Sequence, residues 1–266
     1  MDIGLAHEIE AAERQYLCAR VENLLRIEGN PYGARVFSNG DAACFYVQAT
    51  PSPMFNRIYG DNPGEPQAVL SLLKASAAYS TVTPLIGKAP AMQPYAELAG
   101  ASLEKLKGWT HLQFACAIDN GVANRHPFEI EEVTPQTLAE FAEVHAGGFR
   151  TKPELRELSQ ASFAGHGPDE RMKIYVLRAE GQVVAGALMY LADHGVAYLG
   201  TAATRKTARG AGYHGALISH RIERARAHGC RVVAATALAN SQSRRNLQRA
   251  GLMPSHAQAL YRLADT

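Results

Sequence analysis

The residues with the clearest chemical potential form a basic segment that carries three glycines, residues 205–217, RKTARGAGYHGAL. It follows an apolar, strand-like stretch at 195–203. Small or apolar residues then recur at helical spacing: Gly215, Ile218, Ile222 and Ala225. Glycines let a backbone approach a ligand closely, and the free N–H groups and dipole of a helix N-terminus attract an anion. The pattern predicts a phosphate-binding loop at a strand-to-helix junction.

Cations reinforce this prediction. Arg205, Lys206 and Arg209 lie beside the predicted helix N-terminus and concentrate an anion there, although most of the binding should come from backbone amides. A second element, residues 240–252, NSQSRRNLQRAGL, predicts a helix that begins at an Asn240 cap and stops at a glycine. Its Arg244 and Arg245 are weaker candidates for phosphate contacts, because charges on a helix surface need no ligand.

Residues 209–214, RGAGYH, resemble the Arg/Gln-x-x-Gly-x-Gly/Ala signature of the GCN5-related N-acetyltransferases (GNAT). The order of elements is also similar: a signature helix, a strand at 231–238, and a helix opened by an Asn eleven residues before the Gly of a terminal Gly-Phe pair, here Gly251-Leu252. The resemblance covers about residues 128–261. It implies an α/β (α+β) fold, with a mixed, mostly antiparallel twisted sheet flanked by helices and opened at one strand.

Acetyl-CoA would lie in that opening, as a cosubstrate, with its pyrophosphate on residues 209–215. Backbone groups near residues 199–204 would hold the pantetheine and the thioester oxygen; for the side chains there, a plain core strand is the alternative. The resemblance assigns cofactor contacts to Ala202, Ala203, Thr204, Arg209, Gly210, Ala211, Gly212, Tyr213, His214, Gly215, Asn240 and Ser243.

The chain departs from the family at the residues that would move protons. His214 stands where the signature has Gly or Ala, and Leu247 stands where the family often has the tyrosine that protonates the thiolate. The usual strand glutamate is Tyr198, eleven residues before Arg209. A phenol is a poor base at neutral pH but orients a water or the amine by hydrogen bonding.

The candidate catalytic residues are therefore Tyr198 and, on the last strand, Tyr261, with core packing as the alternative for each. His145 has Phe141 and Phe149 at i−4 and i+4 on a predicted helix. This spacing fits either the floor of an acceptor pocket or a packing histidine.

Composition excludes several classes of protein. A net charge of +2, from 27 Lys plus Arg and 25 Asp plus Glu, does not favour nucleic acid as a partner. The four cysteines form no C-x-x-C pair, so neither a metal site nor a disulfide framework is predicted. The longest apolar run, residues 183–192, is far shorter than the ~20 residues of a membrane helix, and the acidic N-terminus does not resemble an export signal. A cytoplasmic protein without a membrane partner is the expectation.

The chain is long enough for two domains. We expect a degenerate GNAT-like domain at residues 1–120 and an acetyl-CoA-binding GNAT domain at 126–266, joined by a turn-rich linker at 119–127. The first half is expected to repeat the element order of the second and to close with a helix at 93–107. Its loop at 60–64 lacks basic residues, so only the C-terminal half should bind CoA.

The predicted function is acetyl-CoA-dependent N-acetyl transfer to the primary amine of a small metabolite, by direct transfer. A second copy of the chain is a candidate partner, as a homodimer. The rival from another class is a catalytically silent acyl-CoA-binding regulatory module. A third alternative, transfer from charged tRNA, is disfavoured by the near-neutral charge.

Overall fold

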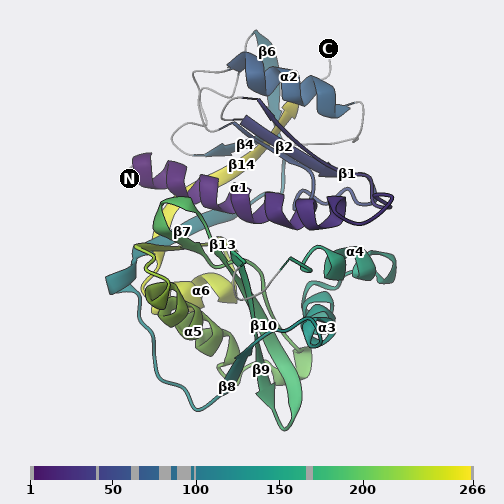
Figure 1. The fold of residues 1–266 in the computed structure, drawn as a ribbon. Coiled ribbons are helices and arrows are strands. Elements are labelled where there is room, and N and C mark those ends of the chain that lie inside the picture. Colours follow the sequence, from purple (N-terminus) through teal and green to yellow (C-terminus); the bar gives the residue numbers. More distant parts are fainter. Residues whose placement is uncertain are drawn as a thin grey trace. The chain divides into compact units, whose positions relative to one another are not determined.

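The computed structural model describes residues 3–39, 42–60, 66–77, 85–88, 97–98, 100–165 and 170–264. Two compact units make up the chain (Figure 1). Unit 1 comprises residues 1–112 together with 256–266, and unit 2 comprises residues 113–255. The C-terminal residues therefore complete the first unit rather than the second.

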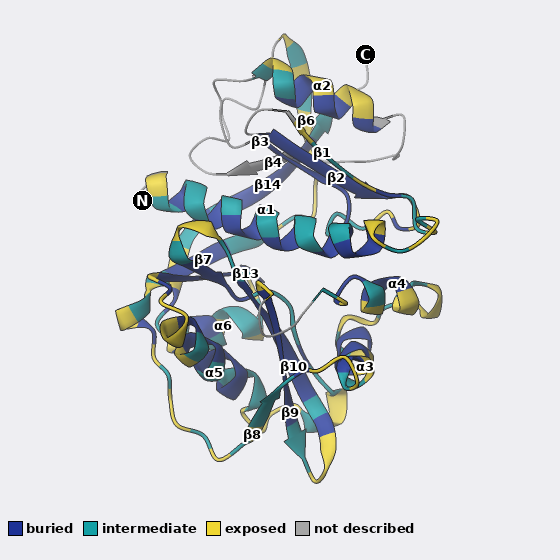
Figure 2. Cartoon of the chain, in the orientation of Figure 1, coloured by how far each residue is buried: buried dark blue, intermediate teal, exposed yellow. Residues whose placement is uncertain are grey.

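Unit 1 contains a sheet with α1 (Ile3–Leu25) against one face and α2 (Pro66–Ala77) against the other (Figure 1). Both faces of its second strand are buried, which its unbroken apolar sequence AACFYV predicts (Figure 2). The strands are β1 (Ala34–Asn39), β2 (Ala42–Val47), β3 (Arg57–Gly60), β4 (Leu85–Lys88), β5 (Glu97–Leu98), β6 (Ala101–Lys105) and the end of β14 (Met253–Leu263).

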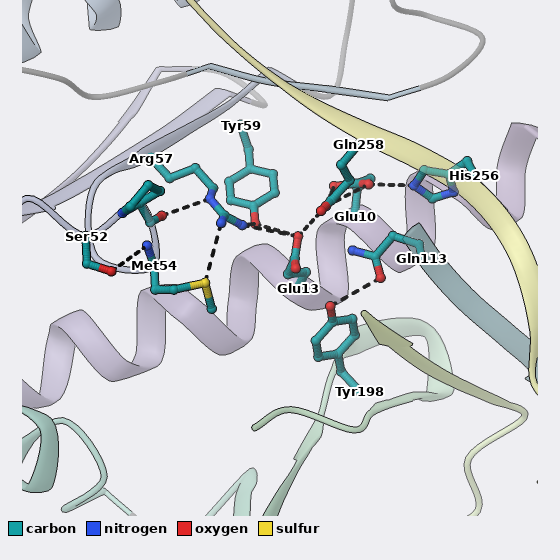
Figure 3. Close-up of polar contacts among 11 residues, drawn as sticks. Glu10, Glu13, Ser52, Met54, Arg57, Tyr59, Gln113, Tyr198, His256 and Gln258 are labelled. Atoms are coloured by element: carbon teal, nitrogen blue, oxygen red, sulfur yellow. Dashed lines mark hydrogen bonds and ion pairs between the residues drawn. The ribbon is translucent and has the colours of Figure 1, made fainter. Parts of the chain in front are cut away.

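A buried polar network lies between α1 and this sheet (Figure 3). The Glu13 carboxylate accepts hydrogen bonds from Tyr59 Oη at 2.8 Å and from Gln258 Nε2 at 2.6 Å, and it pairs with Arg57 at 3.4 Å. Glu10 pairs with His256 on β14. Burying charges is costly unless they are paired and hydrogen-bonded, and here each carboxylate has several partners. The network therefore fixes α1 against β3 and β14.

The helix predicted at 93–107 is wrong over residues 101–105, which form β6. Gly100, at φ +81°, makes the turn between β5 and β6, and β6 pairs antiparallel with β14. Ala101 and Leu103 pack against the unit 1 core, so their period is two rather than 3.6. The loop at 61–64 and residues 93–96 lie outside the described residues.

Unit 2 is built on a sheet with the strand order β8-β9-β10-β11-β13-β7, in which β12 also pairs with β10. The pairs β8–β9, β9–β10, β10–β11 and β10–β12 are antiparallel, whereas β11 and β13 run parallel. The strands are β7 (His111–Ala117), β8 (Glu129–Glu132), β9 (Met172–Ala179), β10 (Gln182–Leu191), β11 (Val196–Tyr198), β12 (Ala202–Thr204) and β13 (Val232–Leu238).

Helices cover both faces of the unit 2 sheet (Figure 1). They are α3 (Leu138–Phe149), α4 (Arg156–Ala161), α5 (Tyr213–Ala227) and α6 (Gln242–Arg249). A Cβ at Gly186 on β10 would lie 2.6 Å from Phe141 of α3, whereas Tyr175 on β9 stacks edge-on against His220 of α5. Since Val176 is opposite Gly186 and Tyr175 opposite Ala187, α3 and α5 lie on opposite faces.

The division between the units differs from the predicted linker at 119–127. That segment lies inside unit 2, where Val122 N donates to Ala250 O, Asn124 N to Ser219 Oγ, and Arg226 to the carbonyls of Ile118 and Gly121. Turn-forming residues made it look like a connector, but these hydrogen bonds between distant residues fix it to α5 and α6. A domain order of 1–120 and 126–266 stays a prediction.

Candidate functional site

The central feature of unit 2 is a place where its sheet opens. The parallel pairing of β11 with β13 ends at Tyr198 opposite Ala234, with a last hydrogen bond from Leu199 N to Ala234 O of 2.7 Å. From residue 202 the chain continues as β12, which pairs with β10 instead. The strand-like stretch at 195–203 therefore contains two short strands, and β12 diverges from β13.

A β-bulge marks the point of divergence. Tyr198 is opposite Tyr190 and Ala202 is opposite Ala187, so the three residues 199–201 face the two residues 188–189. The extra residue bends the strand and shifts the alternation of side chains by one. Because opposite residues share a face, Tyr198 and Ala203 both lie on the α3 side, with Tyr190 and Gly186. After Leu199, residues 200–203 carry small side chains, which leaves the backbone open to close approach by a ligand.

Close packing holds α3 against the bulged strand. A Cβ at Gly148 of α3 would lie 2.6 Å from Ala203 Cβ, and one at Gly186 would clash with Phe141. The two glycines let the helix approach the sheet at the point where the sheet opens.

The glycine loop, residues 209–215, connects β12 to α5 as predicted. Gly210 (φ +92°) and Gly212 (φ +86°) adopt left-handed conformations, and Gly212 is the N-cap of α5. The first helical hydrogen bond runs from Ala216 N to Gly212 O, so the amides before Ala216 in α5 have no partner within the helix. A Cβ added at Gly210, Gly212 or Gly215 would meet no protein atom within 4 Å. Open space at the helix N-terminus fits a bound phosphate.

His214, within this loop, contributes no cation. Burial, and secondarily the Arg221 guanidinium, lowers the pKa of its imidazole to about 4. Its Nδ1 accepts a hydrogen bond from Asn246 Nδ2 at 2.8 Å. The side chain therefore joins α5 to α6, which gives a bulky residue at this signature position a packing role.

The basic side chains around the loop differ in their contacts and exposure. Arg205 donates to Val183 O at 2.7 Å and pairs with Glu143 of α3 at 3.0 Å, so it holds β12 and α3 together. Lys206 and Arg209 are exposed at the loop. These two side chains are the basic groups placed to attract an anion from solvent.

The N-cap of α6 is Ser241 rather than Asn240. Ser241 Oγ accepts from Arg244 N at 3.1 Å, while Asn240 lies one residue outside and is exposed. Both residue types are good caps, so sequence did not distinguish them. Ser243 is half-buried in the first turn of the helix, and Arg244 donates to Ala239 O at 2.7 Å. Leu247 is buried, as a packing residue of α6.

Tyr198, the predicted catalytic tyrosine of β11, is only 1% exposed. Its hydroxyl donates to Gln113 Oε1 of β7 at 3.2 Å (Figure 3). Gln113 Nε2 is buried and finds no acceptor among the described residues. A buried donor without a partner is costly, so this amide is suited to hold a water or an acceptor group beside Tyr198.

Tyr261, the other predicted catalytic tyrosine, lies on β14 in unit 1. Its ring belongs to the apolar cluster between the sheet and α2, with Tyr46, Ile58 and Leu73. Burial raises the pKa of its hydroxyl. This position favours the packing role that the sequence left open.

One contact escaped the sequence analysis entirely. His145 Nε2 of α3 lies 2.9 Å from Oγ1 of Thr201, a residue of the bulge. The two residues are 56 positions apart, and Thr201 carried no motif of its own. The apolar neighbours of His145 at i−4 and i+4 were the one available signal.

Among the described residues, no group of three or more His, Cys, Asp or Glu side chains is arranged to hold a metal ion. Within the same residues, no helix is long and apolar enough to cross a membrane.

Comparison with known proteins identifies a family for part of the chain. Residues 137–252 match the model of the acetyltransferase (GNAT) family. Comparison with curated proteins gave no match. Among solved structures, a GCN5-related N-acetyltransferase from Kribbella flavida has a TM-score of 0.63 at 14% identity, covering 96% of each chain.

Two further structures agree. A GCN5-related N-acetyltransferase from Sphaerobacter thermophilus has a TM-score of 0.56 at 16% identity, covering 95% of this chain and 89% of that one. A GNAT-family acetyltransferase from Colwellia psychrerythraea has a TM-score of 0.55 at 13% identity, covering 92% and 97%. At these identities the likeness shows the fold. The family match shows that residues 137–252 form a domain of the GNAT family, whose members are acyltransferases.

Proposed function

We propose that the protein transfers the acetyl group of acetyl-CoA to the primary amine of a small metabolite, by direct attack of the amine on the thioester. The observation that carries this proposal is the glycine loop at the N-terminus of α5, which follows the strand that diverges from β13. A helix N-terminus with open space beside three glycines suits a pyrophosphate.

The residues present fit the cosubstrate. The amides of residues 213–215 and the side chains of Lys206 and Arg209 would hold its phosphates, and the backbone of residues 199–204 would hold the pantetheine arm beside the bulge. When bound, acetyl-CoA supplies an activated acyl group. The protein's part is to fix that group against the amine and to offer hydrogen-bond donors to the carbonyl oxygen.

The acceptor would approach from the α3 side of the sheet. Tyr198 and Ala203 face that side, and the rings of Phe141, Phe149 and Phe163 gather around His145 there. Phe149 is 56% exposed, a large apolar surface next to the opening in the sheet. This environment suits a small molecule with an apolar portion beside its amine.

A regulatory acyl-CoA-binding module is the second candidate. Leu247 stands where the family often has a tyrosine that acts as the acid, and Tyr198 stands where it often has a glutamate that acts as the base. The Tyr198 hydroxyl is hydrogen-bonded to Gln113. A protein that had kept its CoA loop and lost catalysis would show this pattern.

Release of free CoA, which carries a thiol, distinguishes the acetyltransferase from the regulatory module. Purified protein is incubated with acetyl-CoA and a panel of alkyl and aryl amines, and free CoA is titrated with a thiol reagent. Amine-dependent release supports the enzyme. Tight CoA binding without release for any amine supports the module.

A further inference from the structure

The contact between His145 and Thr201 lies where the reaction would take place. Thr201 is the last residue of the bulge, between the end of the β11–β13 pairing and the start of β12. Its main-chain carbonyl accepts from Leu188 N at 2.8 Å, which fixes the residue against β10. Its hydroxyl then points toward α3, within 2.9 Å of His145 Nε2. A hydroxyl and an imidazole at this distance exchange a proton readily.

The imidazole is held in one orientation by aromatic rings. Its ring centroid lies 4.6 Å from that of Phe149, in a stacked arrangement, and 5.0 Å from that of Phe163, edge to face. Phe141 lies 5.9 Å away on the same helix face. The charged side chains of α3 are engaged elsewhere, because Glu140 pairs with Arg178 and Glu143 with Arg205. Apolar walls around a fixed imidazole suit a group that takes up a proton in the reaction rather than one that is permanently charged.

The reaction requires such a group. An alkyl amine is mostly protonated at neutral pH and has a lone pair only after it loses a proton. The two positions that often supply acid and base in the family hold Leu247 and the buried Tyr198. In the part of unit 2 that the structure describes, His145 is a titratable side chain hydrogen-bonded to a residue of the bulge.

We propose that Thr201 and His145 form the proton relay for the acceptor amine. This inference rests on the proposed transferase function. The ammonium form of the acceptor donates one proton to Thr201 Oγ1 while Thr201 donates its own to His145 Nε2. The neutral amine nitrogen then forms a bond to the acetyl carbon and loses its second proton to solvent as the carbon–sulfur bond breaks and CoA leaves as a thiolate. The imidazolium returns the first proton to the thiolate or to solvent, so charge and atoms balance. His145 acts through Thr201, which alone would touch the amine.

A set of variants at Thr201 and His145 tests the relay. Thr201→Val removes the hydroxyl and keeps the shape, and Thr201→Ser restores the hydroxyl. With an alkyl amine we expect Thr201→Val and His145→Gln each to lower kcat roughly 100-fold or more, and Thr201→Ser to stay within about tenfold of the wild type. The double variant should lose no more than either single one, because both residues serve one proton path. His228→Gln, at an exposed site at the end of α5, is the matched control and should leave kcat unchanged.

Two readouts distinguish proton transfer from a merely structural hydrogen bond. Added imidazole should restore part of the activity of His145→Ala. An aryl amine, neutral at pH 7, should be acetylated with a much smaller loss in Thr201→Val than an alkyl amine is. CoA affinity, measured by calorimetry, should be the same in all variants, which shows that unit 2 is folded.

Different results would overturn the proposed function and the proton relay. Wild-type protein that binds CoA but acetylates no amine overturns the proposed function, and the relay with it. Wild-type turnover that survives Thr201→Val overturns the relay alone. So does an equal loss for alkyl and aryl amines, because a structural role would not depend on the protonation of the acceptor.

Discussion

The imidazole of His214 accepts a hydrogen bond from the side-chain amide of Asn246, at 2.8 Å. This bond joins the first turn of α5, which carries the glycine loop, to α6. Its acceptor is an unprotonated nitrogen, and burial holds the pKa of that imidazole at about 4. The geometry of the loop therefore depends on a neutral histidine.

Acid should weaken this contact. The unfolded chain has an ordinary histidine pKa near 6.5, whereas the folded value for His214 is about 4. Between these values the unfolded state binds a proton that the folded state excludes, so the free energy of unfolding should fall as the pH falls from 6.5 to 4. Urea denaturation across this range measures the slope. His214→Gln should reduce the slope but not abolish it, because burial also lowers the pKa of His220 to about 4. An unchanged slope in that variant would contradict the assignment.

Elements that depend on residues close together in the sequence were predictable. Elements that depend on pairing with a strand far away in the sequence were not. The glycine loop and α5 followed from residues within one short segment, and both were correct. Residues 101–105 were predicted to be helical from local spacing, yet pairing with β14, from the other end of the chain, makes them a strand. The bulge at 199–201 was also hidden, because its cause is a register shift between β10 and two partners.

The candidate site divides in the same way. The glycines of the loop carry a signature, so the loop and the start of α5 were predictable, while their role in binding a phosphate stays a prediction. The pair of His145 and Thr201 has no signature, since it exists only once α3 has packed on the opened strand. The hydrogen bond between Tyr198 and Gln113 was hidden for the same reason, because it joins residues 85 positions apart.

The glycine loop gives a binding prediction. Gly215 faces open space without a left-handed backbone, so a larger side chain there should fill the proposed phosphate site without strain. We expect Gly215→Trp to weaken CoA at least roughly tenfold, or about 1.4 kcal/mol, and Gly215→Ala to bind more tightly than Gly215→Trp. The more disruptive Gly212→Trp should also lose affinity. Calorimetry on folded variants decides, and unchanged CoA affinity in both Trp variants would mean that the site is misplaced.

The stoichiometry of CoA binding tests the prediction that only the C-terminal half of the chain binds CoA. The basic glycine loop occurs once, at residues 209–215, and the sequence at 60–64 is GDNPG. We expect one CoA per chain in a calorimetric titration. Two equivalent sites would contradict the prediction that the first half lacks an anion site.

Tyr198 gives a prediction about solvent in the site. Its hydroxyl donates to Gln113, whose own amide donor is unpaired among the described residues. If the two groups order a water beside the acceptor, Tyr198→Phe should lower turnover roughly tenfold to a hundredfold and leave CoA binding intact. Steady-state kinetics with the preferred amine measures this. Full activity in the variant would assign Tyr198 to core packing alone.

Transfer of the acetyl group itself tests the central claim most directly. The protein is incubated with acetyl-CoA labelled with ¹³C in the acetyl group and with the amine panel, and the products are identified by mass spectrometry. The account predicts one labelled amide for each CoA released, in wild-type protein and not in Gly215→Trp at low acetyl-CoA. Label that appears only as acetate, or remains in acetyl-CoA with every amine, would contradict it.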